Sequence, residues 1–252
     1  MEYLLQTVDG HITDPDILTV ANALNKRCID YTLSDTPMTG YLPIGDLSFV
    51  QDCIKIPMPP IGIPEALLVP YFTKRRVEKI KGRSMPSAGL YHIKDISHTK
   101  GFSYTGDILW FYQNFHQDYH PDLMYEISDI IDIQSEYRVF VYNKEILDIR
   151  RYSGDYAVFP NIELIKQAVT LYNVQPTAPK AYTLDFGVGG KNDETFILEA
   201  HPFCAVGLYG FTSPYLPEMY KAGINWYLQS SNKELIESST PSSRTPRINS
   251  GA

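Results

Sequence analysis

The chain is poor in cysteine and tryptophan and has no excess of positive charge. It contains 3 cysteines and 2 tryptophans among 252 residues. An odd, small number of cysteines in a chain of this length argues against a disulfide framework and favours a reducing compartment. Lys and Arg number 22 against 29 Asp and Glu, which gives a formal net charge of −7 with neutral histidines. Such a chain is a poor general binder of polyanions, so nucleic acid is not an expected partner.

Long apolar runs are also missing. The first five residues have no basic region and begin no apolar run, so they do not form a secretory signal peptide. The apolar run from Ala66 to Val69 is broken by Pro70, far short of the roughly 20 residues of a membrane span. We therefore expect a soluble, cytoplasmic protein with no membrane partner.

What the chain does contain is sufficient for a packed core. Hydrophobic residues make up 44% of the sequence and charged residues 20%. The length fits one ordinary domain or two small lobes that share a cleft. Residues 1–65 read as strand, helix and strand, with Pro15 at the first helical position. This order predicts a small parallel α/β unit.

The rest of the chain divides by composition. Four prolines between residues 56 and 64 indicate a linker, and a helix is predicted over 65–81. The basic run from Lys74 to Arg76 is either a solvated helix face or a phosphate-facing patch. Residues 90–211 are rich in strand patterns with one inserted helix near Asn161, and a last helix is predicted over 216–229. Residues 231–252, rich in Ser, Thr and Pro, predict a disordered tail.

Two carboxylates are expected to face each other across a hairpin. Alternating runs at 181–188 and 195–202 flank a turn-rich loop, and folding about Asn192 puts Asp185 opposite Glu199. Like charges directly across a ladder destabilise it within a scale of ~0.2–1 kcal/mol. A divalent cation bridging both groups relieves this conflict, and oxygen ligands favour Mg²⁺ over zinc. The other interpretation is a hydrated hairpin face with Glu199 exposed.

Arginines are expected to converge on a second hairpin. Its outgoing strand carries Arg138, and its return strand brings either Arg150 or Arg151 close by. Two neighbouring guanidiniums favour an anion between them, such as phosphate or carboxylate. The equally good alternative pairs each arginine with a carboxylate of the same hairpin.

A lysine-bearing strand precedes these hairpins. Lys94 lies near its end, and a polar loop with two glycines and Lys100 follows. Backbone N–H groups and lysines of such a loop could cover phosphates as a flap. The spacing is not that of a Walker loop. The plainer interpretation of Lys94 is a solubilising residue at a strand end.

Taken in order, these segments resemble the ATP-grasp superfamily, most closely a clade of small ATP-grasp proteins named for two arginines and a lysine. The resemblance covers roughly residues 70–230, and residues 1–65 resemble the Rossmann-like pre-ATP-grasp domain in pattern only. It implies an α+β fold of antiparallel sheets with helices, in two lobes at about 66–125 and 126–230 with an ATP cleft between them. The matching segments are 92–95, 100–102, 132–141, 146–154, 182–188, 198–203 and 207–210.

The resemblance also implies residue roles. Lys94 would contact the α- and β-phosphates of ATP, with Lys100 in the flap, and Glu136 could meet the ribose hydroxyls. The adenine-binding linker would comprise Glu126, Ile127 and Ser128.

Metal and phosphoryl groups have implied partners as well. Asp185 and Glu199 would hold Mg²⁺, and His201 occupies the third metal position, where relatives usually have asparagine. An imidazole is an unusual Mg²⁺ ligand. The transferring phosphoryl group would be held by Arg138 with Arg150 or Arg151.

The implied activity is an ATP- and Mg²⁺-dependent carboxylate–amine ligase that acts through an acyl phosphate. Its partners would be a small-molecule or peptide carboxylate and an amine. His201 motivates an alternative, a non-catalytic ATP-grasp-like nucleotide-binding or interaction protein. A nucleic-acid-modifying enzyme is a third hypothesis, and the net charge opposes it.

Overall fold

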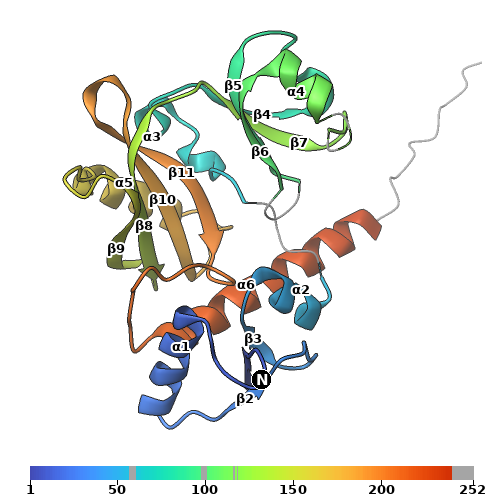
Figure 1. The fold of residues 1–252 in the computed structure, drawn as a ribbon, viewed down its shortest axis with the longest axis vertical. Coiled ribbons are helices and arrows are strands. Elements are labelled where there is room, and N and C mark those ends of the chain that lie inside the picture. Colours follow the sequence, from blue (N-terminus) through green and yellow to red (C-terminus); the bar gives the residue numbers. More distant parts are fainter. Residues whose placement is uncertain (57–60, 98–100, 116, 118, 240–252) are drawn as a thin grey trace, which may run out of the picture.

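The computed structural model describes residues 1–56, 61–97, 101–115, 117 and 119–239, with side chains as far as residue 230. Within these residues the strands form one three-stranded parallel sheet and two four-stranded antiparallel sheets. Figure 1 shows the parallel sheet below the two antiparallel sheets. The mixed α+β class with antiparallel sheets is therefore confirmed.

The N-terminal unit consists of β1 (Tyr3–Gln6), α1 (Pro15–Lys26), β2 (Tyr31–Ser34), β3 (Leu42–Ile44) and α2 (Leu47–Ile54). Its strands are parallel in the order β2-β1-β3, as the strand–helix–strand pattern predicts. The side chain of Asp14 accepts hydrogen bonds from the first free amides of α1, and Pro15 fills a position that needs no donor.

The helix predicted over 65–81 is wrong. This stretch contains the short helices η1 (Glu65–Leu67) and α3 (Pro70–Thr73), then β4 (Val77–Lys81). Pro70 cannot continue a preceding helix because it lacks an N–H and clashes with the turn before it. Lys74 then takes a left-handed conformation with φ of 53°, which ends α3 and turns the chain into β4.

The first antiparallel sheet has the order β4-β7-β5-β6. It includes β5 (Leu90–Asp95), β6 (Ser103–Asp107) and β7 (Met124–Ser128), with η2 (Gly82–Ser84) after β4. The helix α4 (Ile108–Asn114) also belongs here, although the sequence pattern indicated only one helix in this region. Asp107 caps it, and Phe111 packs in an aromatic core with Phe102 and Tyr125.

The second antiparallel sheet has the order β11-β10-β8-β9. Its strands are β8 (Ile133–Tyr142), β9 (Glu145–Gly154), β10 (Ala181–Gly189) and β11 (Glu194–Pro202), with η3 (Gly190–Asn192) in the β10–β11 turn. The helix α5 (Ile162–Asn173) buries Ile165, Val169 and neighbouring residues against Val139 and Leu184 of this sheet. The face opposite α5 is thereby left for the carboxylates and arginines.

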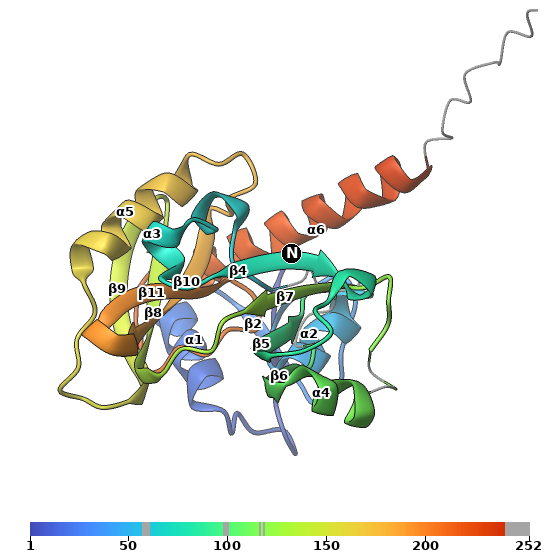
Figure 2. The same cartoon turned by 90° about the horizontal axis from the view of Figure 1, so that it is seen from above.

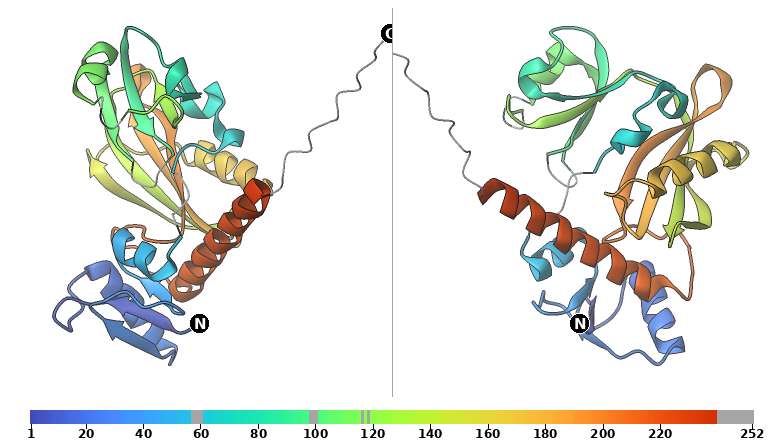
Figure 3. Two further views of the ribbon diagram at one scale, coloured as in Figure 1. Left: turned by 90° about the vertical axis from the view of Figure 1, so that its right-hand side faces the viewer. Right: turned by 180° about the vertical axis from the view of Figure 1, so that it is seen from behind.

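The last helix, α6 (Leu216–Ser239), joins the N-terminal unit to the second antiparallel sheet. Leu5, Phe140 and Tyr220 belong to one core cluster that spans all three parts. Figures 2 and 3 show the C-terminal part of α6 extending away from the rest of the molecule. The predicted tail is therefore wrong over residues 231–239, which are helical and include the helix-favouring residues Lys233, Glu234 and Leu235. Residues 240–252 lie outside the described residues.

Membrane insertion through a helix is not supported. Among the described residues, no helix is both long and apolar enough to cross a bilayer.

The packing of α6 gives a test of the fold. A Cβ on Gly223 would lie 2.0 Å from the backbone oxygen of Phe203. Helix propensity alone favours alanine over glycine by about 1 kcal/mol. We expect the opposite sign, a loss of about 1–3 kcal/mol in the free energy of unfolding of Gly223→Ala, because overpacking dominates. Urea unfolding measures this, with the exposed Lys221→Ala as control, and a stabilised Gly223→Ala protein would contradict the packing.

Candidate functional site

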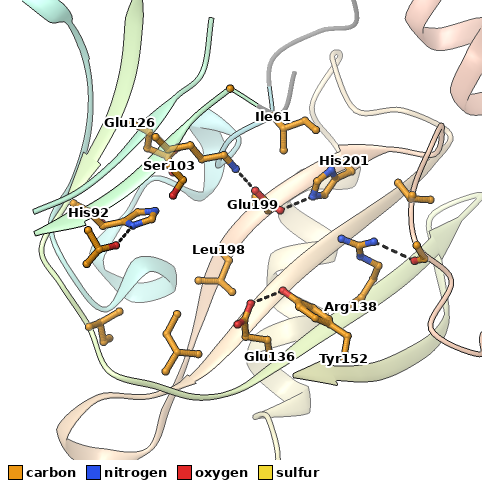
Figure 4. A pocket seen from close by; sticks show the side chains of 18 of the residues that line it. Ile61, His92, Ser103, Glu126, Glu136, Arg138, Tyr152, Leu198, Glu199 and His201 are labelled. Atoms are coloured by element: carbon orange, nitrogen blue, oxygen red, sulfur yellow. Dashed lines mark hydrogen bonds and ion pairs between the residues drawn. The ribbon is translucent and has the colours of Figure 1, made fainter. Parts of the chain in front are cut away.

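A cleft of about 680 Å³ lies between the two antiparallel sheets. Side chains from β5, β6 and β7 line one wall, and side chains from β8, β9 and β11 line the other (Figure 4). Residues 129–133, which cross from one sheet to the other, and the loop after β11 close its ends.

A buried ion pair forms one side of the cleft. Arg138 on β8 donates from Nε and Nη2 to the two carboxylate oxygens of Asp185 on β10, at 2.8 and 2.7 Å. Its Nη1 donates to the carbonyl oxygen of Gly207 at 3.1 Å. The side chains are 7% and 2% exposed. Burial lowers the pKa of Arg138, but the hydrogen bonds and charge of Asp185 outweigh this and raise it overall.

The predicted pairing of Asp185 with Glu199 is confirmed by the register of β10 and β11. The side chain of Glu199 is 24% exposed and that of Asp185 is 2% exposed, so this face is not an open, hydrated one. Lys94 of the other sheet contacts Glu199 Oε2 through Nζ, and His201 Nε2 lies 2.6 Å from Glu199 Oε1. The repulsion between the carboxylates is therefore offset by cationic partners from three strands.

These contacts shift the titration of the cluster. Burial by itself raises the pKa of Glu199, but the hydrogen bond and charge of His201 and the charge of Lys94 lower it well below its usual range. Burial lowers the pKa of His201, and hydrogen bonds with Asp185 and Glu199 raise it overall. The pKa of Asp185 is lowered, because the hydrogen bonds from Arg138 and His201 outweigh burial.

Asp185, Glu199 and His201 together form a set of candidate metal ligands. One ligand atom from each lies within 4.8 Å of the others. Two carboxylate oxygens and one imidazole nitrogen in such an arrangement fit a divalent cation. The described part of the chain therefore supplies a donor set at the position that the hairpin pattern predicted.

The expected convergence of arginines is not seen. Arg150 is the register partner of Arg138, yet its side chain is 42% exposed and pairs with Asp148, which was the alternative interpretation. Arg151 donates to the carbonyl oxygen of Gly154. Neither Arg150 nor Arg151 lines the cleft.

Two tyrosines that the sequence analysis missed lie beside Arg138 instead. The rings of Tyr152 and Tyr209 stack with their centroids 5.0 Å apart, and the Arg138 guanidinium lies 5.7 and 5.1 Å from their centroids. The Tyr152 hydroxyl donates to Glu136 Oε2 at 2.6 Å. The strand alternation that places Tyr152 on the same face as Arg150 was the available signal for Tyr152. Nothing local signals Tyr209.

The residues assigned to the nucleotide are only partly in the cleft. Glu126 lies in the middle of β7, where its Oε2 accepts a hydrogen bond from Ile63 N at 2.9 Å, and burial raises its pKa. Glu126, Ser128 and Glu136 line the cleft, whereas Ile127 packs in the aromatic core. The crossing segment begins only after Ser128. Lys100 lies outside the described residues.

The basic run at Lys74 to Arg76 is divided between surface and cleft. Lys74 pairs with Glu194 and Arg76 with Glu78, as on a solvated surface. Arg75 lines the cleft, where its guanidinium donates to Ser128 Oγ at 3.4 Å and to Ile197 O at 3.2 Å. Burial lowers its pKa. Arg75 is thus a cleft residue, in agreement with the phosphate-facing alternative.

Residues 72–217 match a family model for the ATP-grasp domain, that of family 2 in the clade named for two arginines and a lysine. The match covers more than half of the 252 residues, so this protein belongs to the ATP-grasp superfamily and, within it, to that family of the clade. The resemblance inferred from the motif order is confirmed. No curated protein matches the chain.

Solved structures with similarity include several ligases. A Bacillus anthracis D-alanine–D-alanine ligase complexed with ATP has 12% identity and a TM-score of 0.42, covering 69% of this chain and 64% of that one. The ATP-grasp ligase PsnB with its minimal precursor has 11% identity and a TM-score of 0.48, covering 89% and 98%. A Staphylococcus aureus N5-carboxyaminoimidazole synthetase with ADP has 12% identity and a TM-score of 0.45, covering 65% and 49%. This chain thus spans less than two thirds of the D-alanine–D-alanine ligase structure, and the family assignment rests on the family model.

The two register partners Arg138 and Arg150 give a matched test of the buried pair. Arg138→Ala leaves the carboxylate of Asp185 buried without its bidentate partner, so we expect the free energy of unfolding to fall by about 3–5 kcal/mol. Arg150→Ala removes a largely exposed pair and should cost less than about 1 kcal/mol. Urea unfolding of both variants measures the difference. Equal losses would show that the Arg138 pair is not the buried contact described here.

Cysteine reactivity tests the packing behind the cleft. Cys204 lines the cleft but is buried, and burial raises its pKa to about 12, so its thiol stays protonated at pH 8. Cys53 is buried as well, and Cys28 is exposed. We expect Ellman's reagent to modify one thiol rapidly in the folded protein and all 3 after denaturation. Cys28→Ser should abolish the rapid phase, and a second rapid thiol would contradict the burial of Cys204.

Proposed function

We propose that this protein is an ATP-dependent ligase that uses a divalent cation to join a carboxylate to an amine through an acyl phosphate. Its membership of an ATP-grasp family supports an ATP-dependent ligase. The observation that carries the proposal is the convergence of Lys94, Arg138 and the Asp185–Glu199 pair in one cleft between two sheets. Charged donors and a cation site in one cleft are what phosphoryl transfer requires.

The proposed arrangement has three parts. Residues 1–65 would be the pre-ATP-grasp domain, and lobes at about 66–125 and 126–230 would hold the nucleotide between them. The ribose would lie near Glu136, with the base against the crossing segment at 129–133, since both line the cleft. Arg75 and Lys94 would contact phosphates from the first lobe.

The proposed chemistry has two transfers. A carboxylate oxygen of the substrate attacks the γ-phosphorus, an O–P bond forms, and the bond from that phosphorus to the bridging oxygen breaks to release ADP. The amine nitrogen then attacks the acyl carbon, phosphate leaves, and the amine loses a proton. Lys94 and Arg138 would neutralise negative charge that otherwise keeps a carboxylate away from ATP. A divalent cation at Asp185 and Glu199 would neutralise the remaining phosphate charge.

Substrates of the proposed ligase are a small-molecule or peptide carboxylate and an amine. A non-catalytic nucleotide-binding protein is the second candidate, and His201, in the usual place of an asparagine, favours it. ADP and phosphate release from Mg-ATP in the presence of a panel of acids and amines separates the two. Tight nucleotide binding without release for any pair supports the second candidate.

Removing the cation-binding carboxylates should abolish nucleotide binding. We expect calorimetry to detect Mg²⁺-dependent ATP binding by the wild type, and a loss of at least about tenfold in affinity in Asp185→Asn, Glu199→Gln, since those groups would hold the metal that bridges to the phosphates. The matched control is Glu145→Gln, Asp148→Asn, which removes two carboxylates from the exposed edge hairpin of the same sheet. Equal binding by both double variants would remove the cation from Asp185 and Glu199, and no binding by the wild type would contradict the proposed function.

A further inference from the structure

We propose that the cation site prefers Mn²⁺ to Mg²⁺, with the imidazole nitrogen of His201 as a direct ligand. This inference rests on the proposed function, because it concerns the cation of the same cleft. It assigns His201 a ligand role and links that role to metal choice.

The positions of the three donors suit one cation. His201 Nε2 lies 2.6 Å from Glu199 Oε1 and 3.7 Å from Asp185 Oδ2. Adjacent ligands of an octahedral cation with bonds of about 2.1 Å are separated by about 3 Å, which falls between these two distances. Small side-chain shifts therefore place all three atoms around a shared centre.

The neighbouring cations do not block these atoms. Lys94 contacts Oε2 of Glu199, which leaves Oε1 on the side of His201. Arg138 takes both oxygens of Asp185, and each carboxylate oxygen has a second lone pair. Lys94 and Arg138 can consequently keep their carboxylate contacts, or exchange them for phosphate oxygens.

A buried hydroxyl stands where a ligating histidine needs a partner. Thr183 is the register partner of His201 across the β10–β11 ladder, and its side chain is fully buried. Thr183 Oγ1 has no hydrogen-bond partner among the described residues. Metal-ligating histidines almost always donate their second ring N–H to an acceptor, which fixes the tautomer. Thr183 is positioned to accept that bond from Nδ1 when Nε2 binds the cation.

The chemistry of the donors determines the preference. Mg²⁺ requires oxygen ligands and loses water reluctantly. Mn²⁺ accepts the same octahedral set of carboxylate, phosphate and water oxygens, but as a first-row transition metal it also binds imidazole nitrogen. With His201 in the set, we expect the site to favour Mn²⁺ over Mg²⁺ by at least about tenfold in affinity.

The test measures the metal directly and not through catalysis. Mn²⁺ is titrated into protein with ADP, bound Mn²⁺ is followed by the loss of the free-ion EPR signal, and Mg²⁺ is added as competitor. Pulsed EPR then examines nitrogen coupling to the bound Mn²⁺ in protein with natural histidine and with ¹⁵N-labelled histidine, because adenine also contains nitrogen. The expected result is a coupling that changes isotope with the label.

Variants complete the experiment. His201→Asn replaces the nitrogen by an amide oxygen and should lose the histidine coupling and about tenfold of the Mn²⁺ preference. The control His11→Asn, at an exposed histidine of the N-terminal unit, should keep both. The labelling result in the wild type requires no variant, so a poorly folded His201→Asn protein does not decide the matter.

The failures are distinguishable. Bound Mn²⁺ without histidine coupling, or equal affinity for Mn²⁺ and Mg²⁺, overturns this inference and leaves the proposed function in place. Absence of any Mn²⁺ or Mg²⁺ binding with ADP overturns the inference together with the cation that the proposed function requires.

Discussion

The buried pair of Arg138 and Asp185 is the interaction on which the site depends. Removing two charges from water is costly, and the attraction between them compensates only when geometry is good and the remaining donors are satisfied. Here both conditions hold, because the contact is bidentate and the third donor of Arg138 reaches the carbonyl oxygen of Gly207. The pair thereby ties β8, β10 and the loop after β11 to one point. Side chains at that point are positioned for a ligand without a search through rotamers.

The loop after β11 shows how that point is reinforced. Ala205 and Tyr209 adopt φ values of 49° and 50°, which are strained for residues with a Cβ. The loop is held by the contact of Gly207 with Arg138 and by a 2.7 Å hydrogen bond from Leu208 N to Asp16 of the N-terminal unit. All three parts of the molecule therefore meet beside the guanidinium. The strain persists because contacts from different parts determine the conformation.

Local sequence pattern was sufficient for features that local geometry controls. The alternation of β10 and β11 around a turn placed Asp185 opposite Glu199, and the Asp14–Pro15 signal placed the start of α1. The same reasoning failed over 65–81, where an apolar spacing compatible with a helix is interrupted by Pro70 and becomes a strand. Helix and strand periods are hard to separate over such short stretches.

Contacts between distant segments were beyond the sequence. Lys94 and Glu199 are 105 positions apart, and their contact exists only because the two sheets face each other. The partner of Arg138 was sought on its own hairpin, whereas the pairing of β8 with β10 supplies Asp185. Tyr209 reaches the guanidinium from a loop with no periodic signal. The candidate residues were thus largely identifiable, but their partners followed from sheet order, which one sequence without pairing information does not specify.

The central claim is that the cleft between the antiparallel sheets binds a nucleotide with its phosphates between Lys94 and Arg138. The most direct test is a crystal structure of the protein grown with a non-hydrolysable ATP analogue and a divalent cation. The account predicts the phosphates beside Lys94 and Arg138, the ribose near Glu136, and the cation on Asp185 and Glu199. A nucleotide bound elsewhere, or a cleft in which Lys94 and Arg138 contact no phosphate, would contradict it.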